Sequence, residues 1–275
     1  MIIGIDIGGT TTDIVGLKDG NIINPLTVKA DDPVTSAAGA LGKFLETKNI
    51  ALNQIKMISA TGVGSGKVRN SLFGIPVQTV DEFKAVGTAG SFLSGLKKAV
   101  VVSMGTGTAI VTVDDAKIAH WGGSGVGGGT LIGLAGKMLN IKSIDTLVEK
   151  AMRGKLENVD LTVGDIAGGS MDSLPASITA SNFGKMSDQA SDEDIAIAII
   201  NLVAQTIGVM GIAAARACNI RDIILTGKLS GIVPIKIVLE RVAELYKTKF
   251  VIPEYAGFAT AIGAAIYIDR TLKPR

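Results

Sequence analysis

The sequence predicts an α/β fold made of two equivalent halves that face a common cleft. Three observations support this prediction: apolar strands alternate with amphipathic helices, a strand–glycine turn–strand unit occurs twice, and 35 of the 275 residues are glycine. This share of glycine is well above the roughly 7% of an average protein. Many of the glycines are clustered, and such clusters form turns in which the backbone can approach a ligand closely.

The first half begins with a hairpin. The β-branched run at residues 2–7 ends at Gly8 and Gly9, and a second apolar run returns from it to residue 17. Asp6 lies just before the turn, where a carboxylate could hold Mg²⁺ against phosphates bound by the turn. An ordinary hairpin with a solvated acid is the alternative reading of this stretch. Further strands are expected at 22–28, 56–60 and 77–80, and helices at 33–48 and 83–96.

The pattern begins again near residue 99. Displaced by 96 positions, Gly9 and Thr10 correspond to Gly105 and Thr106, and Asp19 corresponds to Asp115. A period of this length is too long for a solenoid and indicates a duplicated domain. We expect an N-terminal domain at 1–97 and a C-terminal domain at 98–275, with both turns directed into one cleft. The second domain should contain strands at 99–104, 109–113, 220–225 and 249–252, and helices at 130–139, 144–152, 235–246 and 259–268.

Two more glycine-containing turns belong to the second half. Residues 122–129 lead into the helix expected from 130, and a glycine loop at a helix start offers unpaired N–H groups to an anion. A flexible linker is the alternative, although linkers are usually richer in serine and polar residues. Residues 226–231 form a further turn that could contact a nucleotide.

Composition limits the possible partners and location. The formal net charge is +2 and there is no long basic run, so nucleic acid is not expected as a partner. Cys218 is the single cysteine, which excludes an internal disulfide and favours the cytoplasm, as does an N-terminus without signal-peptide features. Residues 195–215 are uncharged and long enough to span a membrane. Because 191–194 resemble a capping box, we expect a buried central helix and no membrane contact.

Several segments resemble the type II pantothenate kinases, of the eukaryotic and staphylococcal types, within the actin, Hsp70 and sugar-kinase superfamily. They are 6–10, 80–83, 104–108, 122–129, 160–169 and 174–186, of which 180–184 is the most specific. The resemblance covers nearly the whole chain. It implies duplicated ribonuclease-H-like domains around a nucleotide cleft, a homodimer, and transfer of a phosphoryl group from ATP, with Mg²⁺, to the primary hydroxyl of pantothenate in coenzyme A biosynthesis.

The resemblance also implies roles for single residues. Glu82 is the expected catalytic base, a role worth about 10²–10⁴-fold in rate. The alternatives are that Glu82 is only a helix N-terminal acid or that Asp81 is the base. Asp6 would organise Mg²⁺. The phosphates would be held by Asp6, Gly8, Gly9, Thr10, Gly105, Thr106, Gly107 and Thr108, the adenosine side by Gly125, Gly127, Gly128, Gly129, Thr226 and Gly227, and the acceptor substrate by Thr106, His120 and Trp121.

Three positions depart from the family pattern. Asp13 replaces a lysine, so either another basic residue takes its place or nucleotide binding is weaker. His120 replaces an arginine that meets the pantothenate carboxylate, and a neutral imidazole is a poor substitute for a bidentate guanidinium. Val251 and Ile252 stand where the staphylococcal enzyme has a tyrosine. The acceptor is therefore pantothenate held differently or a related alcohol such as pantetheine.

Other functions remain open at this point. The opening residues are also similar to those of the ATPase activators of 2-hydroxyacyl-CoA dehydratases and benzoyl-CoA reductases. Those activators bridge an iron–sulfur cluster with two cysteines from each subunit, and this chain has one cysteine. The ROK sugar kinases are disfavoured for a similar reason, since their zinc motif needs several cysteines. A non-catalytic nucleotide-binding regulator is a further alternative, which turnover with a panel of substrates would distinguish.

Overall fold

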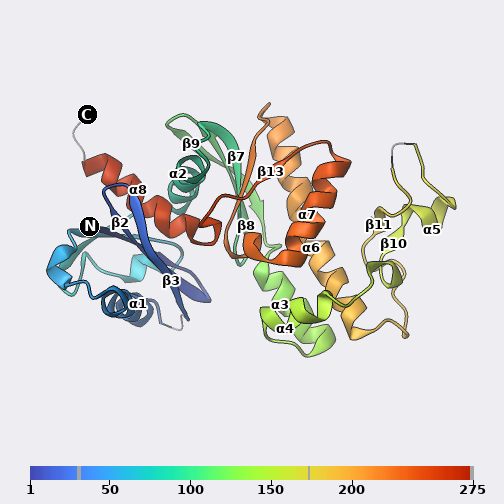
Figure 1. Ribbon diagram of the computed structural model, residues 1–275, viewed down its shortest axis with the longest axis horizontal. Coiled ribbons are helices and arrows are strands. Elements are labelled where there is room, and N and C mark those ends of the chain that lie inside the picture. The colour runs from blue at the N-terminus through green and yellow to red at the C-terminus, as the bar shows by residue number, and fades with distance from the viewer. Residues whose placement is uncertain (30–31, 173, 273–275) are drawn as a thin grey trace.

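The computed structural model describes residues 1–29, 32–172 and 174–272, and it contains one mixed sheet in each half of the chain (Figure 1). The first sheet has the strand order β3-β2-β1-β4-β6-β5, and the second has the order β13-β12-β7-β8-β9. The strands of the first sheet are β1 (Ile2–Ile7), β2 (Thr11–Lys18), β3 (Asn21–Lys29), β4 (Met57–Thr61), β5 (Ser71–Leu72) and β6 (Ile75–Thr79). Those of the second are β7 (Lys98–Met104), β8 (Thr108–Asp114), β9 (Lys117–Ser124), β12 (Ile223–Thr226) and β13 (Phe250–Val251).

The two sheets repeat one plan, as the sequence predicts. In each, three consecutive antiparallel strands form a meander whose first strand pairs in parallel with a later strand. Each meander turns at an aspartate with positive φ, Asp19 at 53° and Asp115 at 50°. Each also has a register shift between its second and third strands, directly after Ile14 in one half and after Ile110 in the other. Turns and bulges at matching positions confirm the duplication.

Two helices lie on the first sheet. Helix α1 (Pro33–Lys48) packs Leu41 and Phe44 onto Ile3 and Ile5 of β1. Helix α8 (Ala259–Leu272) covers the other face, although it comes from the end of the chain. Its approach to β1 is so close that a Cβ at Gly4 would overlap the carbonyl oxygen of Ala261. The boundary at residues 97 and 98 stays a prediction, and α8 returns across it to the first sheet.

The remaining helices are arranged around the second sheet. Helix α2 (Glu82–Ser94) packs on α8 and on β7 to β9, so it lies between the two sheets. Helices α3 (Gly128–Leu139), α4 (Ile144–Ala151), α6 (Asp192–Ala217) and α7 (Val233–Leu245) share one large core with β7 and β12. By length and composition α6 could cross a membrane, with a mean hydropathy of 2.1, but 67% of its most apolar window is buried inside the fold. The expectation of a central core helix is confirmed.

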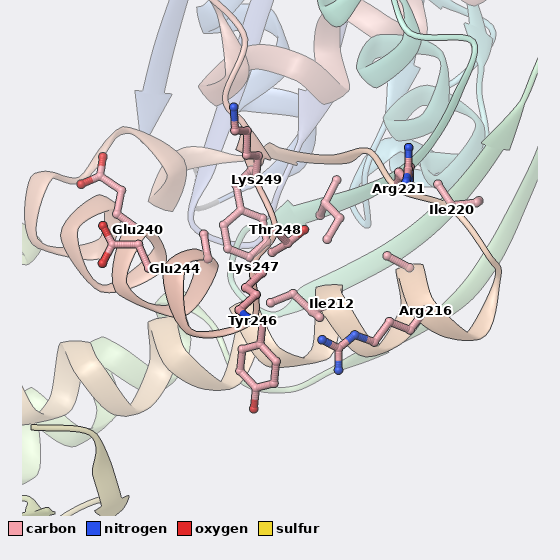
Figure 2. A pocket seen from close by; sticks show the side chains of 14 residues that line it. Ile212, Arg216, Ile220, Arg221, Glu240, Glu244, Tyr246, Lys247, Thr248 and Lys249 are labelled. Atoms are coloured by element: carbon pink, nitrogen blue, oxygen red, sulfur yellow. The ribbon is translucent and has the colours of Figure 1, made fainter. Parts of the chain in front are cut away.

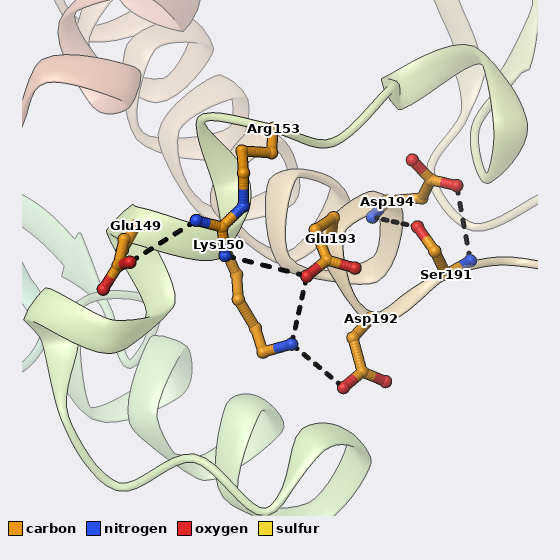
Figure 3. Close-up of polar contacts among 7 residues, drawn as sticks. All are labelled: Glu149, Lys150, Arg153, Ser191, Asp192, Glu193 and Asp194. Carbon is orange, nitrogen blue, oxygen red and sulfur yellow. Dashed lines mark hydrogen bonds and ion pairs between the residues drawn. The ribbon is translucent and has the colours of Figure 1, made fainter.

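The start of α6 is fixed by polar contacts (Figure 3). The Ser191 hydroxyl accepts a hydrogen bond from the Asp194 N–H at 3.2 Å, and the Asp194 carboxylate accepts one from the Ser191 N–H at 3.3 Å. The predicted capping box is therefore present. Lys150 of α4 forms ion pairs with Asp192 at 3.2 Å and Glu193 at 3.1 Å, which hold α4 against the first turn of α6.

The structure also contains elements that the sequence did not reveal. Residues 122–124, expected in a loop, belong to β9, and α3 begins at Gly128 instead of residue 130. The segment before α6 forms β10 (Leu161–Thr162), α5 (Val163–Ala167) and β11 (Thr179–Ser181), and it projects from the second sheet (Figure 1). Short 3₁₀ helices are η1 (Leu52–Gln54), η2 (Ser65–Lys67), η3 (Leu156–Asn158), η4 (Lys228–Gly231) and η5 (Ala256–Phe258).

Candidate active site

Carboxylates from three elements meet near the first glycine turn. Asp6 of β1 is paired directly with Asp13 of β2, and residues opposite one another in an antiparallel pair share a face of the sheet. Burial, followed by the negative charges of Asp13 and Glu82, raises the pKa of Asp6 from 3.8 to about 7. Glu82, which opens α2, is therefore within electrostatic reach of Asp6. The structure thus brings together the predicted metal-binding residue and the predicted base.

A cation from the second half of the chain balances these acids. The Lys228 ammonium lies 2.7 Å from the Asp13 carboxylate and 2.8 Å from the Thr27 hydroxyl. Its positive charge acts to lower the pKa of Asp6 and of Asp13, although burial leaves both pKa values raised overall. Of the two outcomes expected at position 13, the structure supports replacement of the missing lysine by another basic residue.

The turn after β4 packs directly against the Asp6 carboxylate. Gly62 has a φ of 83°, and a Cβ at this position would overlap the Asp6 carboxylate. A side chain at Gly62 would therefore displace the carboxylate as well as strain the backbone. Thr260 of α8 donates a hydrogen bond to the Asp6 side chain, which lowers its pKa. Sequence reasoning did not select Gly62, Thr260 or Lys228, although the glycine turn at 61–66 and the turn at 226–231 were visible signals.

Glu82 and Asp81 have different surroundings. The Asp81 carboxylate accepts a hydrogen bond from the Lys84 N–H at 3.0 Å, so Asp81 is the N-cap of α2. Glu82 is the first helical residue, one position before the helix start expected at residue 83. Its pKa is raised by partial burial and by the nearby charge of Asp81. With Asp81 engaged in capping, Glu82 is the better placed of the two acids to accept a proton.

Two of the three residues expected to contact the acceptor, His120 and Trp121, lie on β9. The His120 ring stacks on Phe83, which follows Glu82, with centroids 3.9 Å apart and an angle of 14° between the planes. His120 therefore contacts the residue that follows the expected base in α2. Trp121 occupies the bulge of β9, opposite no residue of β8, and its side chain is 42% exposed. A bulge redirects a side chain, and bulges are frequent next to active sites.

Each glycine turn is closed by a backbone hydrogen bond. The Gly8 N–H donates to the Thr11 carbonyl at 3.0 Å, and the Gly105 N–H donates to the Gly107 carbonyl at 2.9 Å. The turn residues Gly9, Thr10 and Thr106 are exposed. Both turns therefore present backbone and hydroxyl groups at the surface, as a phosphate site requires.

The third glycine cluster differs from the expectation. The N–H groups of Gly128 and Gly129 donate to the carbonyls of Gly105 and Thr106, both at 2.9 Å, and the Gly127 N–H donates to the Thr130 hydroxyl at 3.1 Å. The prediction that this helix start offers unpaired N–H groups is wrong for these three glycines. Because a Cβ at Gly127 would be 2.6 Å from the Thr106 carbonyl oxygen, the cluster instead packs against the second turn. Gly125 is exposed beside it.

The hydroxyls of two threonines predicted to contact the nucleotide form hydrogen bonds to the backbone instead. The buried Thr108 hydroxyl donates to the Val126 carbonyl at 2.8 Å, and the buried Thr226 hydroxyl donates to the Val102 carbonyl at 3.5 Å. Gly227 has a φ of 88° and approaches the backbone of Met104 too closely for a Cβ. These residues fix the second turn and the end of β12 in place, and both threonine hydroxyls are engaged by backbone carbonyls.

One pocket lies away from all of these residues. It has a volume of about 990 Å³ and is lined by α6, α7 and the amino end of β12, including Arg216, Ile223 and Tyr246 (Figure 2). Thr226 and Gly227 are at the opposite, carboxyl end of β12. In the part of the chain that the structure describes, no three His, Cys, Asp or Glu side chains are grouped to hold a metal ion by themselves.

Comparison with known proteins identifies the family. The model of the Fumble family matches residues 98–267. The chain belongs to the Fumble family. This Fumble-family chain is 28% identical over 279 residues to a type II pantothenate kinase of Bacillus cereus (strain G9842), and the alignment covers 98% of both chains. A type II pantothenate kinase of Oceanobacillus iheyensis is 31% identical over 205 residues, covering 71% of this chain and 77% of the relative.

Solved structures show the fold of the Fumble-family chain. The activator of the 2-hydroxyisocaproyl-CoA dehydratase from Clostridium difficile, with bound ADPNP, superposes with a TM-score of 0.68 at 18% identity, covering 100% of this chain and 98% of the activator. A ROK family glucokinase from Streptomyces griseus, in complex with glucose and AMPPNP, gives a TM-score of 0.61 at 14% identity, covering 97% of this chain and 98% of the glucokinase. The predicted superfamily fold is confirmed.

Proposed function

We propose that this chain is an ATP-dependent kinase that phosphorylates the primary hydroxyl of pantothenate in coenzyme A biosynthesis. Full-length similarity to type II pantothenate kinases supports the reaction. The observation that carries the mechanism is the meeting of Asp6, Asp13, Glu82 and Lys228 beside the first glycine turn, from elements far apart in the chain. Two nucleotide-bound structures with the same fold support the use of ATP.

The donor set at Asp6 fits Mg²⁺. Magnesium prefers carboxylate oxygens and is usually held by one or two carboxylates together with waters and substrate phosphates. Asp6 supplies such oxygens, and Gly62 leaves room for its carboxylate, while the Asp13 carboxylate opposite it is engaged by Lys228 and Thr27. We propose that Asp6 holds the ion and that the ion, when bound, neutralises charge on the phosphates.

Glu82 is proposed to take the proton of the acceptor hydroxyl. Phosphoryl transfer passes through a loose transition state, so positioning and charge neutralisation provide most of the rate enhancement. The pKa of Glu82 is raised and is therefore closer to neutral pH than that of an ordinary glutamate. A general base is most effective when its pKa is near the working pH. Phe83, which follows Glu82 in α2, and His120, which stacks on Phe83, would line the acceptor site. The exposed turn residues Gly9, Thr10, Thr106 and Gly125 would contact the nucleotide.

We also propose a cytoplasmic homodimer without nucleic-acid or membrane partners. A single cysteine and a nearly neutral net charge support this location and these partners. Exposed apolar side chains on the projecting segment, Ile166 at 66% and Met171 at 50%, support contact with a second copy. Size-exclusion chromatography with light scattering measures the oligomeric state directly.

The deciding experiment is a substrate panel. ATP-dependent phosphorylation is measured with pantothenate, pantetheine and several sugars offered separately. We expect transfer to pantothenate or pantetheine; transfer to a sugar alone contradicts the proposal. ATP hydrolysis without transfer to any acceptor would favour the dehydratase-activator function, and nucleotide binding without any turnover would favour a regulator. The activator function also requires an iron–sulfur cluster, so an iron assay on the purified protein separates it from a kinase.

A further inference from the structure

Lys228 is held in a fixed position between the two sheets. It begins η4, directly after Gly227, whose backbone lies against Met104 at the end of β7. The Gly227 N–H donates to the Ala256 carbonyl at 2.8 Å, which ties this turn to η5. The backbone of Lys228 is thus anchored at the carboxyl end of the second sheet, beside the second glycine turn.

The side chain extends from there to the first sheet. Its ammonium contacts the Asp13 carboxylate at 2.7 Å, the Thr27 hydroxyl at 2.8 Å and the face of the Phe258 ring at 3.8 Å from the centroid. Thr27 in turn donates to Asp13 at 2.6 Å, so the three polar groups form a closed network. Asp13 and Thr27 lie on β2 and β3, so the network spans the two halves of the chain.

The ammonium retains capacity for a ligand. An ammonium group has three N–H donors; Asp13 and Thr27 accept two of them, and the third has no oxygen acceptor among the contacts of the described residues, although the Phe258 ring lies against the same ammonium. The Asp13 side chain is only 10% exposed, whereas the Lys228 side chain is 39% exposed. Solvent, or a ligand, can therefore reach the network at Lys228 and not at Asp13. The same charge acts to lower the pKa of Asp6, the proposed magnesium-binding residue, which places Lys228 at the phosphate end of the site.

We propose that Lys228 binds the terminal phosphates of ATP and that Asp13 is a positioning residue that holds its ammonium at the junction of the two halves. This inference rests on the proposed function only in taking ATP as the ligand and not in the identity of the acceptor. Lysine is suited to this task because its ammonium is a compact charge that binds phosphate oxygens without a fixed geometry. The competing explanation is that the Asp13–Lys228 pair is only a structural tie between the halves.

Equilibrium binding of ATP and of adenosine tests the proposal by isothermal titration calorimetry. In Lys228→Met and Lys228→Gln we expect ATP to bind at least about tenfold more weakly, because a charge-assisted hydrogen bond to phosphate is lost. Adenosine affinity should stay within about twofold, because adenosine has no phosphate to lose. Lys228→Gln keeps a donor for Asp13 and Thr27, so it remains informative if Lys228→Met does not fold. Lys249→Met, an exposed lysine at the other end of the second sheet, is the matched control.

Asp13→Asn separates the two explanations. If Lys228 binds phosphate and Asp13 holds its ammonium, Asp13→Asn should weaken ATP binding less than Lys228→Gln does, since the ammonium remains, and adenosine affinity should stay within about twofold. Equal loss of affinity for both ATP and adenosine in Asp13→Asn and Lys228→Gln would show a structural tie and overturn the proposal. Unchanged ATP affinity in Lys228→Gln, or an equal loss for adenosine, would also overturn it. A wild-type protein that binds ATP but phosphorylates neither pantothenate nor pantetheine refutes the proposed function and leaves this inference standing.

Discussion

Asp6 is predicted to destabilise the metal-free protein at neutral and alkaline pH. Its pKa is about 7 in the folded chain, because its carboxylate is buried and faces Asp13 and Glu82, against an ordinary value of 3.8. The folded state therefore binds the Asp6 proton more tightly than the unfolded state does. The stability that this proton provides is fully present below about pH 4 and is lost as the pH rises through about 7.

The size of the effect follows from the two pKa values. At 1.36 kcal/mol per pH unit, the difference between 3.8 and about 7 corresponds to on the order of 4 kcal/mol at pH 8 and to about 1 kcal/mol at pH 4.5. Asp6→Asn removes the titrating group and keeps its shape. We therefore expect Asp6→Asn to raise the free energy of unfolding by about 2–4 kcal/mol at pH 8. At pH 4.5 the change caused by this substitution should be about 3 kcal/mol smaller than at pH 8.

Urea unfolding followed by circular dichroism measures this difference, with EDTA present and at both pH values. Asp188→Asn, which changes an exposed carboxylate remote from the site, should show no such gain. An Asp6→Asn gain of the same size at the two pH values, or a loss of stability at pH 8, would refute the electrostatic argument. Addition of Mg²⁺ and ATP should stabilise the wild type more than Asp6→Asn, because the carboxylate then has a partner.

Three further predictions concern the site and its support. Glu82→Gln should lower kcat about 10²–10⁴-fold with little change in ATP affinity, and full activity in this variant would exclude Glu82 as the base. Gly62→Ala should weaken Mg²⁺-dependent ATP binding, measured by calorimetry with and without Mg²⁺, because a Cβ there overlaps the Asp6 carboxylate and φ is 83°. Asp160→Ala should reduce the free energy of unfolding by about 3 kcal/mol in urea titrations, since Asp160 is fully buried and accepts hydrogen bonds from donors such as Asn182 at 3.1 Å; a loss under 1 kcal/mol would contradict this.

Local features of the fold were predictable because neighbouring residues specify them. Strand–turn–strand units, the repeat at 96 positions and the capping box at Ser191 depend on apolar periodicity, turn residues and side chains within a few positions. The aspartates that turn both meanders, Asp19 and Asp115, are at corresponding places for the same reason. No helix or strand was predicted in the less regular segment between η3 and α6, because its strands β10 and β11 are short and pair with each other.

The candidate site was predictable in part. Asp6 and Glu82 came from motif resemblance, and the structure brings them within electrostatic reach. Hydrogen bonds between distant residues, in contrast, could not be foreseen: the sequence of the glycine cluster does not indicate that Gly128 and Gly129 donate to the second turn. The distinction between Asp81 as the cap and Glu82 as the freer acid likewise depends on a helix boundary one residue away from the expected one.

The sequence by itself determined the duplicated α/β plan, the two glycine turns and the acids next to the first of them. Only the tertiary structure decided that Lys228 meets Thr27, 201 positions away, and that α8 returns to the first sheet. The physical reason is the sequence distance over which the interactions act. Turns, caps and periodic faces are set by interactions within a few residues, whereas an ion pair between two halves depends on how whole sheets and helices pack, which no local pattern encodes.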